Sequence, residues 1–129
     1  MPSSPKPELN DDFRDMLGLL LKHRVEFLLI GAHALAAHGF PRYTDDIDFW
    51  VRHTPENAQR VWQAVAEFGA PMDQITVADF QRPKHVIQLG VAPHRIDLTT
   101  SLTGVDWDEA WAGRVEVTIE GMVTPVLGR

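Results

Sequence analysis

Two aspartates separated by a single residue, Asp46 and Asp48, are the side chains of this sequence best suited to do chemistry. On a β-strand, residues two apart project to the same face, with their bases roughly 6.5 Å apart. Two ionised carboxylates at that spacing repel each other, and two divalent cations about 3.5 to 4 Å apart would neutralise them and bridge a triphosphate. The pair therefore predicts a site for Mg²⁺ or Mn²⁺.

A third acid, Asp97, stands between Ile96 and Leu98 in a later strand-like run. These apolar neighbours would turn Asp97 to the opposite face of its own strand, where it could join the first two acids. Mg²⁺ accepts a few carboxylates together with water and phosphate oxygens, so three strand carboxylates suit a cation that is shared with a substrate. Asp97 could also orient or deprotonate an attacking hydroxyl.

The elements that must position these acids follow from the spacing of the apolar residues. A strand over 25–30 ends at Gly31, which opens a tight turn before a short helix of small residues over 32–38. Free backbone N–H groups at such a turn can hold an anionic phosphate. An Asp-X-Asp by itself is as typical of a solvated strand edge, but its place on the next strand, over 46–51, favours a cation and phosphate site.

The remaining patterns predict one mixed α/β domain over residues 1–129, with a frayed segment over 1–7. We expect helices on one face of a mixed sheet and an acidic cleft on the other. The further elements are an amphipathic helix from Leu9 to Leu21, a helix that begins at Thr54 and Pro55 and ends at Gly69, antiparallel strands over 85–89 and 95–99, a helix around 107–111, and a hairpin of 115–119 and 123–127 joined through Gly121.

Composition excludes several classes of protein. The 129 residues contain no cysteine, which excludes a disulfide framework and a thiolate zinc site. No apolar run approaches the roughly 20 residues that cross a bilayer, and no signal segment follows Met1, so we expect a cytoplasmic protein without a membrane. The formal net charge of −6 opposes broad capture of nucleic acid but does not exclude an RNA substrate.

Three segments carry a family resemblance: Leu28–Gly39, Arg42–Val51 and Arg95–Gly104. In order and spacing they resemble the DNA polymerase beta-like nucleotidyltransferase superfamily, especially small bacterial members related to abortive-infection and toxin–antitoxin nucleotidyltransferases. The resemblance spans most of the chain. It implies that Asp46 and Asp48 bind the catalytic metals, that Asp97 completes the site, and that Gly31 opens the phosphate-binding turn.

The reaction that the resemblance implies is transfer of a nucleoside monophosphate from a nucleoside triphosphate to a hydroxyl, with release of pyrophosphate. The acceptor could be an RNA end, a protein hydroxyl or a small molecule, and a cognate partner protein is a further expectation. Ala32 departs from the family pattern because it lacks a hydroxyl, and the chain stops at Arg129, where similar proteins continue with a basic helical segment. The alternatives are a catalytically weak nucleotide-binding or protein-interaction module, and a purely structural acidic domain.

Each of the other candidate residues has a structural interpretation as well as a functional one. Ala32 and His33 could contact phosphate at the turn, although a histidine there can equally be structural. Arg42 and Thr44 could bind phosphate or orient Asp46, whereas a loop arginine is as often a solvated charge. Two tryptophans differ in their expected roles: Trp50 alternates with the aspartates and could line the cleft against a nucleotide, and Trp62 is expected in the core.

Overall fold

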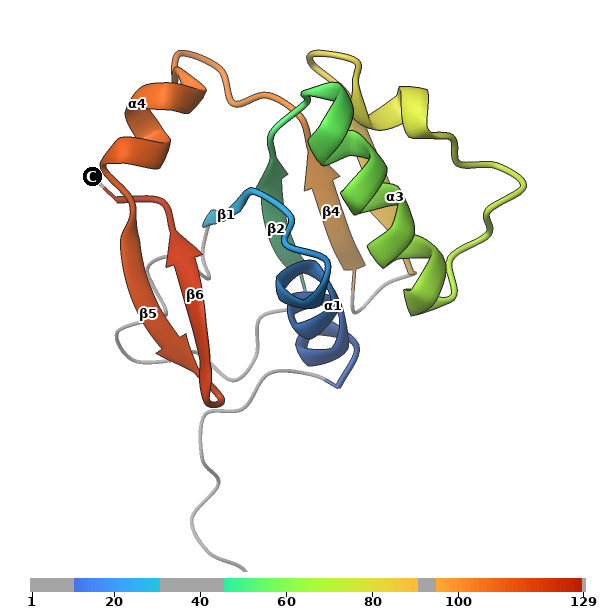
Figure 1. Cartoon of the computed structure of the whole chain (residues 1–129), viewed down its shortest axis with the longest axis horizontal. Coiled ribbons are helices and arrows are strands. Elements are labelled where there is room, and N and C mark those ends of the chain that lie inside the picture. Colours follow the sequence, from blue (N-terminus) through green and yellow to red (C-terminus); the bar gives the residue numbers. More distant parts are fainter. Residues whose placement is uncertain (1–10, 31–45, 91–94, 129) are drawn as a thin grey trace, which may run out of the picture.

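The computed structural model describes residues 11–30, 46–90 and 95–128, and Figure 1 shows how their elements are arranged. The helices in these ranges are α1 (Asp11–Lys22), α3 (Pro55–Phe68), the short 3₁₀-helix η1 (Val77–Phe80) and α4 (Trp107–Ala112). The strands are β1 (Phe27–Ile30), β2 (Asp46–Val51), β3 (Val86–Leu89), β4 (Arg95–Thr99), β5 (Val115–Ile119) and β6 (Met122–Val126). The helices and strands expected in these ranges are confirmed, and the helix expected over 32–38 lies outside them.

The strands form one mixed sheet in the order β3-β4-β2-β1-β6-β5. β2 runs parallel to β4 and antiparallel to β1, and β6 runs parallel to β1. The outer strands β3 and β5 pair antiparallel with their neighbours, and Gly121, at φ 81°, closes the hairpin between β5 and β6. The mixed α/β fold predicted from the sequence is therefore confirmed.

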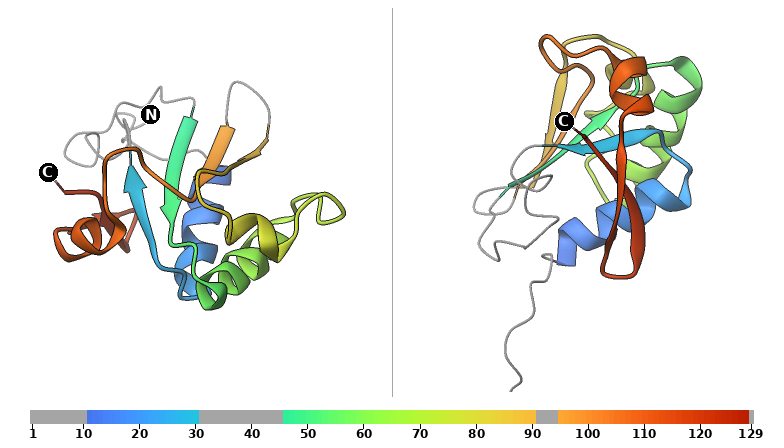
Figure 2. Two further views of the ribbon diagram at one scale, coloured as in Figure 1. Left: turned by 90° about the horizontal axis from the view of Figure 1, so that it is seen from above. Right: turned by 90° about the vertical axis from the view of Figure 1, so that its left-hand side faces the viewer.

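One face of the sheet carries the main hydrophobic core, which α1 and α3 cover (Figure 2). Ile47, Phe49 and Val51 of β2 are fully buried on this face, because strand side chains alternate. The helices contribute their apolar stripes: Phe13, Met16, Leu17 and Leu20 from α1, and Ala58, Val61, Ala64 and Val65 from α3. The face that bears the aspartates of β2 therefore points away from these two helices.

The opposite face of the sheet has an apolar part, which the sequence did not lead us to expect. Leu28 and Ile30 of β1 and Trp50 of β2 are buried there together with Ala110 of α4. Trp50 packs edge-on against Trp107 of the same helix, with ring centroids 5.0 Å apart. The sequence predicts helices on one face and an acidic cleft on the other, and α4 covers the apolar part of this second face because three large apolar side chains would otherwise meet water.

The helix α3 begins and ends where its sequence predicts. Thr54 is the N-cap, and its side chain accepts a hydrogen bond from the Asn57 N–H, while Pro55 occupies the first helical position. Gly69 ends the helix at φ 100°, a left-handed conformation that favours glycine. Neither α3 nor another helix in the described ranges has the length and apolar character to cross a membrane.

One buried amide ties the start of α3 to β1 and β2. The Asn57 side chain accepts a hydrogen bond from the Glu26 N–H at 2.7 Å and donates to the carbonyls of Glu26 and Arg52 at 2.9 and 2.8 Å. Asn57 is 2% exposed. Because Glu26 precedes β1 and Arg52 follows β2, this side chain fixes one end of the antiparallel pair of β1 and β2, of which β2 carries Asp46 and Asp48.

Replacing Asn57 by Ala is expected to lower the free energy of unfolding by about 2 to 4 kcal/mol, because the partly buried Glu26 N–H and Arg52 carbonyl lose the side-chain partner that Asn57 provides. Urea unfolding measures the change. Gln59→Ala, at an exposed position of the same helix, is the control and is expected to change stability by no more than about 0.5 kcal/mol. Equal effects of the two substitutions would contradict the role assigned to Asn57.

Candidate active site

The register between two parallel strands brings the predicted acids together. β2 and β4 pair so that Asp48 lies opposite Asp97 and Asp46 lies opposite Arg95. Paired strands lie about 4.8 Å apart, so the side chains of Asp48 and Asp97 are neighbours on the face turned away from α1 and α3. The alternation of each strand was readable from the sequence, whereas the meeting of the two acids depends on this register.

The carboxyl groups of Asp48 and Asp97 are electrostatically crowded. Burial, together with the neighbouring charge of Asp97, raises the pKa of Asp48 to about 6, because both effects disfavour a second ionised carboxylate. The Oδ1 atom of Asp97 is buried and has no hydrogen-bond partner among the described residues. Buried polar atoms normally have a partner, so this oxygen is free to accept a proton donor or to ligate a cation.

Asp46 is held by an arginine that we did not single out from the sequence. Arg95 Nε and Nη2 donate hydrogen bonds to the two carboxylate oxygens of Asp46, each at 3.2 Å. The guanidinium lowers the pKa of Asp46, and the carboxylate in turn raises the pKa of Arg95. The alternation with Asp97 places Arg95 on the acidic face of β4, but its contact with Asp46 again depends on the strand register.

The three acids suit a divalent cation in their chemistry, although they do not form a closed metal site. Within residues 11–30, 46–90 and 95–128, no three His, Cys, Asp or Glu side chains are arranged to hold an ion. Asp46 faces Arg95, while Asp48 and Asp97 offer crowded carboxylates and one unpaired oxygen. Hard oxygen ligands of this kind fit Mg²⁺ or Mn²⁺, which would relieve the crowding.

The Asp48–Asp97 pair has a buried neighbour on β1 and an exposed neighbour on β3. Ile30 of β1 lies opposite Asp48, and Gln88 of β3 lies opposite Asp97. Ile30 is buried and Gln88 is exposed. No motif marks Gln88 in the sequence, and only its pairing with β4 shows that it flanks the acids. Among the described residues, the exposed side of the pair is therefore the β3 side.

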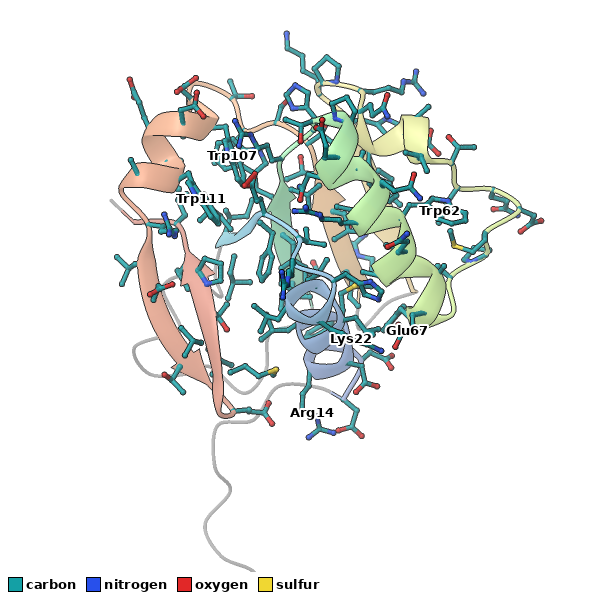
Figure 3. All side chains as sticks on the ribbon, in the orientation of Figure 1. Arg14, Lys22, Trp62, Glu67, Trp107 and Trp111 are labelled. Atoms are coloured by element: carbon teal, nitrogen blue, oxygen red, sulfur yellow. The ribbon has the colours of Figure 1, made fainter. Side chains whose placement is uncertain are left out.

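The tryptophans of the chain do not extend this site. Trp50 shares the face of the aspartates, as expected, but it is 2% exposed and lies against Trp107, which stacks on Trp111 with centroids 5.5 Å apart (Figure 3). The expectation that Trp50 contacts a nucleotide is therefore wrong, because α4 covers it. Trp62 is partly buried, and its indole N–H donates to the Ile75 carbonyl at 3.2 Å, which agrees with a role in packing.

The residues predicted to bind phosphate lie outside the described residues: Gly31, Ala32, His33, Arg42 and Thr44. β1 ends at Ile30, opposite Asp48, and β2 begins at Asp46. The described residues on the two sides of segment 31–45, Ile30 and Asp46, therefore both belong to the candidate site or adjoin it. The roles of these five residues stay predictions.

A hollow of about 360 Å³ lies between α1 and α3, on the side of the sheet away from the carboxylates. Figure 3 shows three of its lining side chains, Arg14, Lys22 and Glu67, near one end of the two helices. Lys22 pairs with Glu67 at 2.6 Å, and Arg14 pairs with Asp11 at 2.8 Å. Because these charges are already paired with each other, the carboxylate site is the better candidate for function.

The raised pKa of Asp48 makes a prediction about pH. Since the folded state binds this proton more tightly than the unfolded chain does, Asp48 favours folding at low pH and loses this contribution as the pH rises from about 4 through about 6. Asp48→Asn, which cannot ionise, is expected to raise the thermal unfolding midpoint at neutral pH and to change it little below about pH 4.

Thermal unfolding of the metal-free protein across this pH range measures the effect. Asp73→Asn, at an exposed position beyond α3, is the matched control and should leave the pH profile unchanged. A midpoint gain for Asp48→Asn that is the same at every pH would contradict the assignment.

Comparison with known proteins bears on the fold. No protein-family model and no curated protein matches this chain in sequence. Its structure is similar to the crystal structure of a protein from Thermotoga maritima that carries the provisional name nucleotidyltransferase, with a TM-score of 0.60 and 19% sequence identity. The match covers 90% of this chain and 74% of the other. At this identity the likeness concerns the fold alone, and the chain therefore has a nucleotidyltransferase-like fold.

Proposed function

We propose that this chain is a metal-dependent nucleotidyltransferase, which moves a nucleoside monophosphate from a nucleoside triphosphate to a hydroxyl acceptor and releases pyrophosphate. The observation that carries the proposal is the Asp48–Asp97 pair, side by side on β2 and β4 with an unpaired buried oxygen. The nucleotidyltransferase-like fold in which the pair lies adds support.

Each acid has a distinct role in this proposal. Asp48 and Asp97, with Asp46, would hold Mg²⁺ or Mn²⁺. When bound, such cations neutralise the triphosphate and stabilise the entering and leaving oxygens of an in-line displacement. Asp97 orients the acceptor hydroxyl and takes its proton as the new bond to the α-phosphorus forms and the bond to pyrophosphate breaks. Asp97 suits this role because its Oδ1 has no other partner among the described residues.

The two substrates are proposed to approach from opposite sides of the carboxylate pair. The triphosphate lies on the β1 side, because Gly31 and the predicted phosphate turn directly follow Ile30, which pairs with Asp48. The acceptor lies on the β3 side, where Asp97 is flanked by the exposed Gln88. This arrangement leaves an RNA end, a protein hydroxyl and a small molecule as acceptor classes, and we include a cognate partner protein, which the resemblance to toxin–antitoxin nucleotidyltransferases implies.

A second candidate is a nucleotide-binding or protein-interaction module with weak catalysis. The observation that favours it is the bidentate pair between Arg95 and Asp46, which occupies one of the three predicted metal ligands. A module of this kind would bind nucleotide without turnover, so nucleotide binding and label transfer separate the two candidates.

Label transfer from α-labelled ATP, CTP, GTP and UTP to cell-extract RNA, protein and metabolites tests the function, with Mg²⁺ or Mn²⁺ present. Asp48→Asn is expected to reduce transfer at least about 100-fold, because even partners that only support a metal ligand are worth about 10- to 100-fold. The acceptor class is identified by the fraction that carries the label.

The control for this experiment is again Asp73→Asn, which should retain full transfer because Asp73 is exposed and outside the site. Nucleotide binding by the wild-type chain with no transfer to any fraction would favour the second candidate. Equal transfer by wild type and Asp48→Asn would exclude the carboxylate pair as the catalytic site.

A further inference from the structure

We propose that Arg95 is a positioning residue that neutralises Asp46 in the empty site and moves to the phosphates of the nucleotide when a cation binds, which makes metal and nucleotide binding cooperative. This inference rests on the proposed function and deepens it. It assigns a role to a side chain that lies opposite one candidate metal ligand, Asp46, and two residues before another, Asp97, and that is not itself able to ligate a cation.

The contact between Arg95 and Asp46 competes with metal ligation by Asp46. The Nε and Nη2 donors of Arg95 occupy both carboxylate oxygens of Asp46, and these are the atoms that a divalent cation would use. The positive guanidinium also repels a cation at the neighbouring carboxylates. A cation therefore recruits Asp46 at the expense of this ion pair.

The pair is suited to opening because it is partly solvated. The side chains of Arg95 and Asp46 are 42% and 41% exposed, and ion pairs at such positions contribute little to stability. Within the described residues, Arg95 pairs directly with Asp46 and interacts through its charge with Asp48 and Asp97. Its release would leave a guanidinium beside the cation-binding carboxylates.

A released guanidinium has an obvious partner if a triphosphate occupies the site. Guanidinium donors match the oxygens of a phosphate in a bidentate geometry, and such charge-assisted hydrogen bonds are strong. Arg95 and Asp97 lie two residues apart on the same face of β4, next to the Asp48–Asp97 pair. Arg95 can therefore exchange a carboxylate for a phosphate through side-chain rotation, without displacement of the strand.

The consequence is a measurable linkage between the two ligands. Without nucleotide, a cation must compete with Arg95 for Asp46, and this lowers its affinity. With nucleotide, the displaced guanidinium gains a new partner, so the nucleotide strengthens cation binding. Because linkage is reciprocal, the cation strengthens nucleotide binding by the same factor.

The test is a binding cycle with Mn²⁺ and α,β-methylene ATP, a nucleotide whose α–β bond cannot be cleaved. Electron paramagnetic resonance measures the affinity of the nucleotide-free protein for Mn²⁺. Calorimetry measures the affinity for the nucleotide with and without saturating Mn²⁺, corrected for Mn²⁺ binding to free nucleotide. Arg95→Gln is expected to bind Mn²⁺ alone about fivefold more tightly than the wild type. In the same variant, the strengthening of nucleotide binding by Mn²⁺ should fall about tenfold.

Two further variants sharpen the result. Arg95→Lys keeps the charge without the planar set of guanidinium donors, so it should retain part of the linkage between Mn²⁺ and nucleotide. This variant replaces Arg95→Gln in the test if circular dichroism shows that Arg95→Gln is unfolded. Arg82→Gln removes the same charge at an exposed position and should leave both affinities unchanged.

The outcomes distinguish this inference from the proposed function. A wild-type linkage that persists unchanged in Arg95→Gln and Arg95→Lys would overturn the role of Arg95 and leave the function standing. If neither the wild type nor Arg95→Gln binds Mn²⁺ at all, both the function and the inference fail.

Discussion

The parallel pairing of β2 with β4 is the constraint on which the candidate site depends. It sets Asp48 opposite Asp97 and Asp46 opposite Arg95, and a slip by one residue would turn one strand's acids into the hydrophobic core. The buried side chains of the other face prevent such a slip. Ile47 and Phe49 of β2 pack against α1 and α3 and hold the strand in register. The core thus positions the chemistry.

Bringing the acids together costs electrostatic free energy, and the surrounding residues compensate this cost for Asp46 but not for the Asp48–Asp97 pair. Asp48 and Asp97 are neighbours in a partly buried place, and burial together with their mutual repulsion raises the pKa of Asp48. Asp46, one step along β2, has Arg95 as a counter-ion. The site therefore contains one neutralised acid and one crowded pair, and a cation that relieves the crowding meets the guanidinium as a competitor. Both the proposed chemistry and the proposed linkage follow from this asymmetry.

The far face of the sheet is shared between the site and a second layer of packing. Leu28, Ile30 and Trp50 form an apolar part that α4 covers, whereas Asp46 and Asp48 of β2 and their partners on β4, Arg95 and Asp97, form the polar part. The boundary falls within β2, between Asp48 and Trp50. Alternation correctly predicted that Trp50 shares the face of the acids, but it could not predict a covering helix that comes more than fifty residues later in the chain.

The sequence by itself determined the local elements and the face on which each acid lies. Helical spacing, the Thr54 and Gly69 caps, and the alternation around Asp46, Asp48 and Asp97 are short-range properties, so they could be interpreted without a structure. The tertiary structure alone decided which side chains meet: Asp48 with Asp97, Arg95 with Asp46, Gln88 beside the pair, and Trp50 beneath Trp107. These contacts depend on strand order and register, which arise from the packing of distant segments and leave no periodic signal in any one of them.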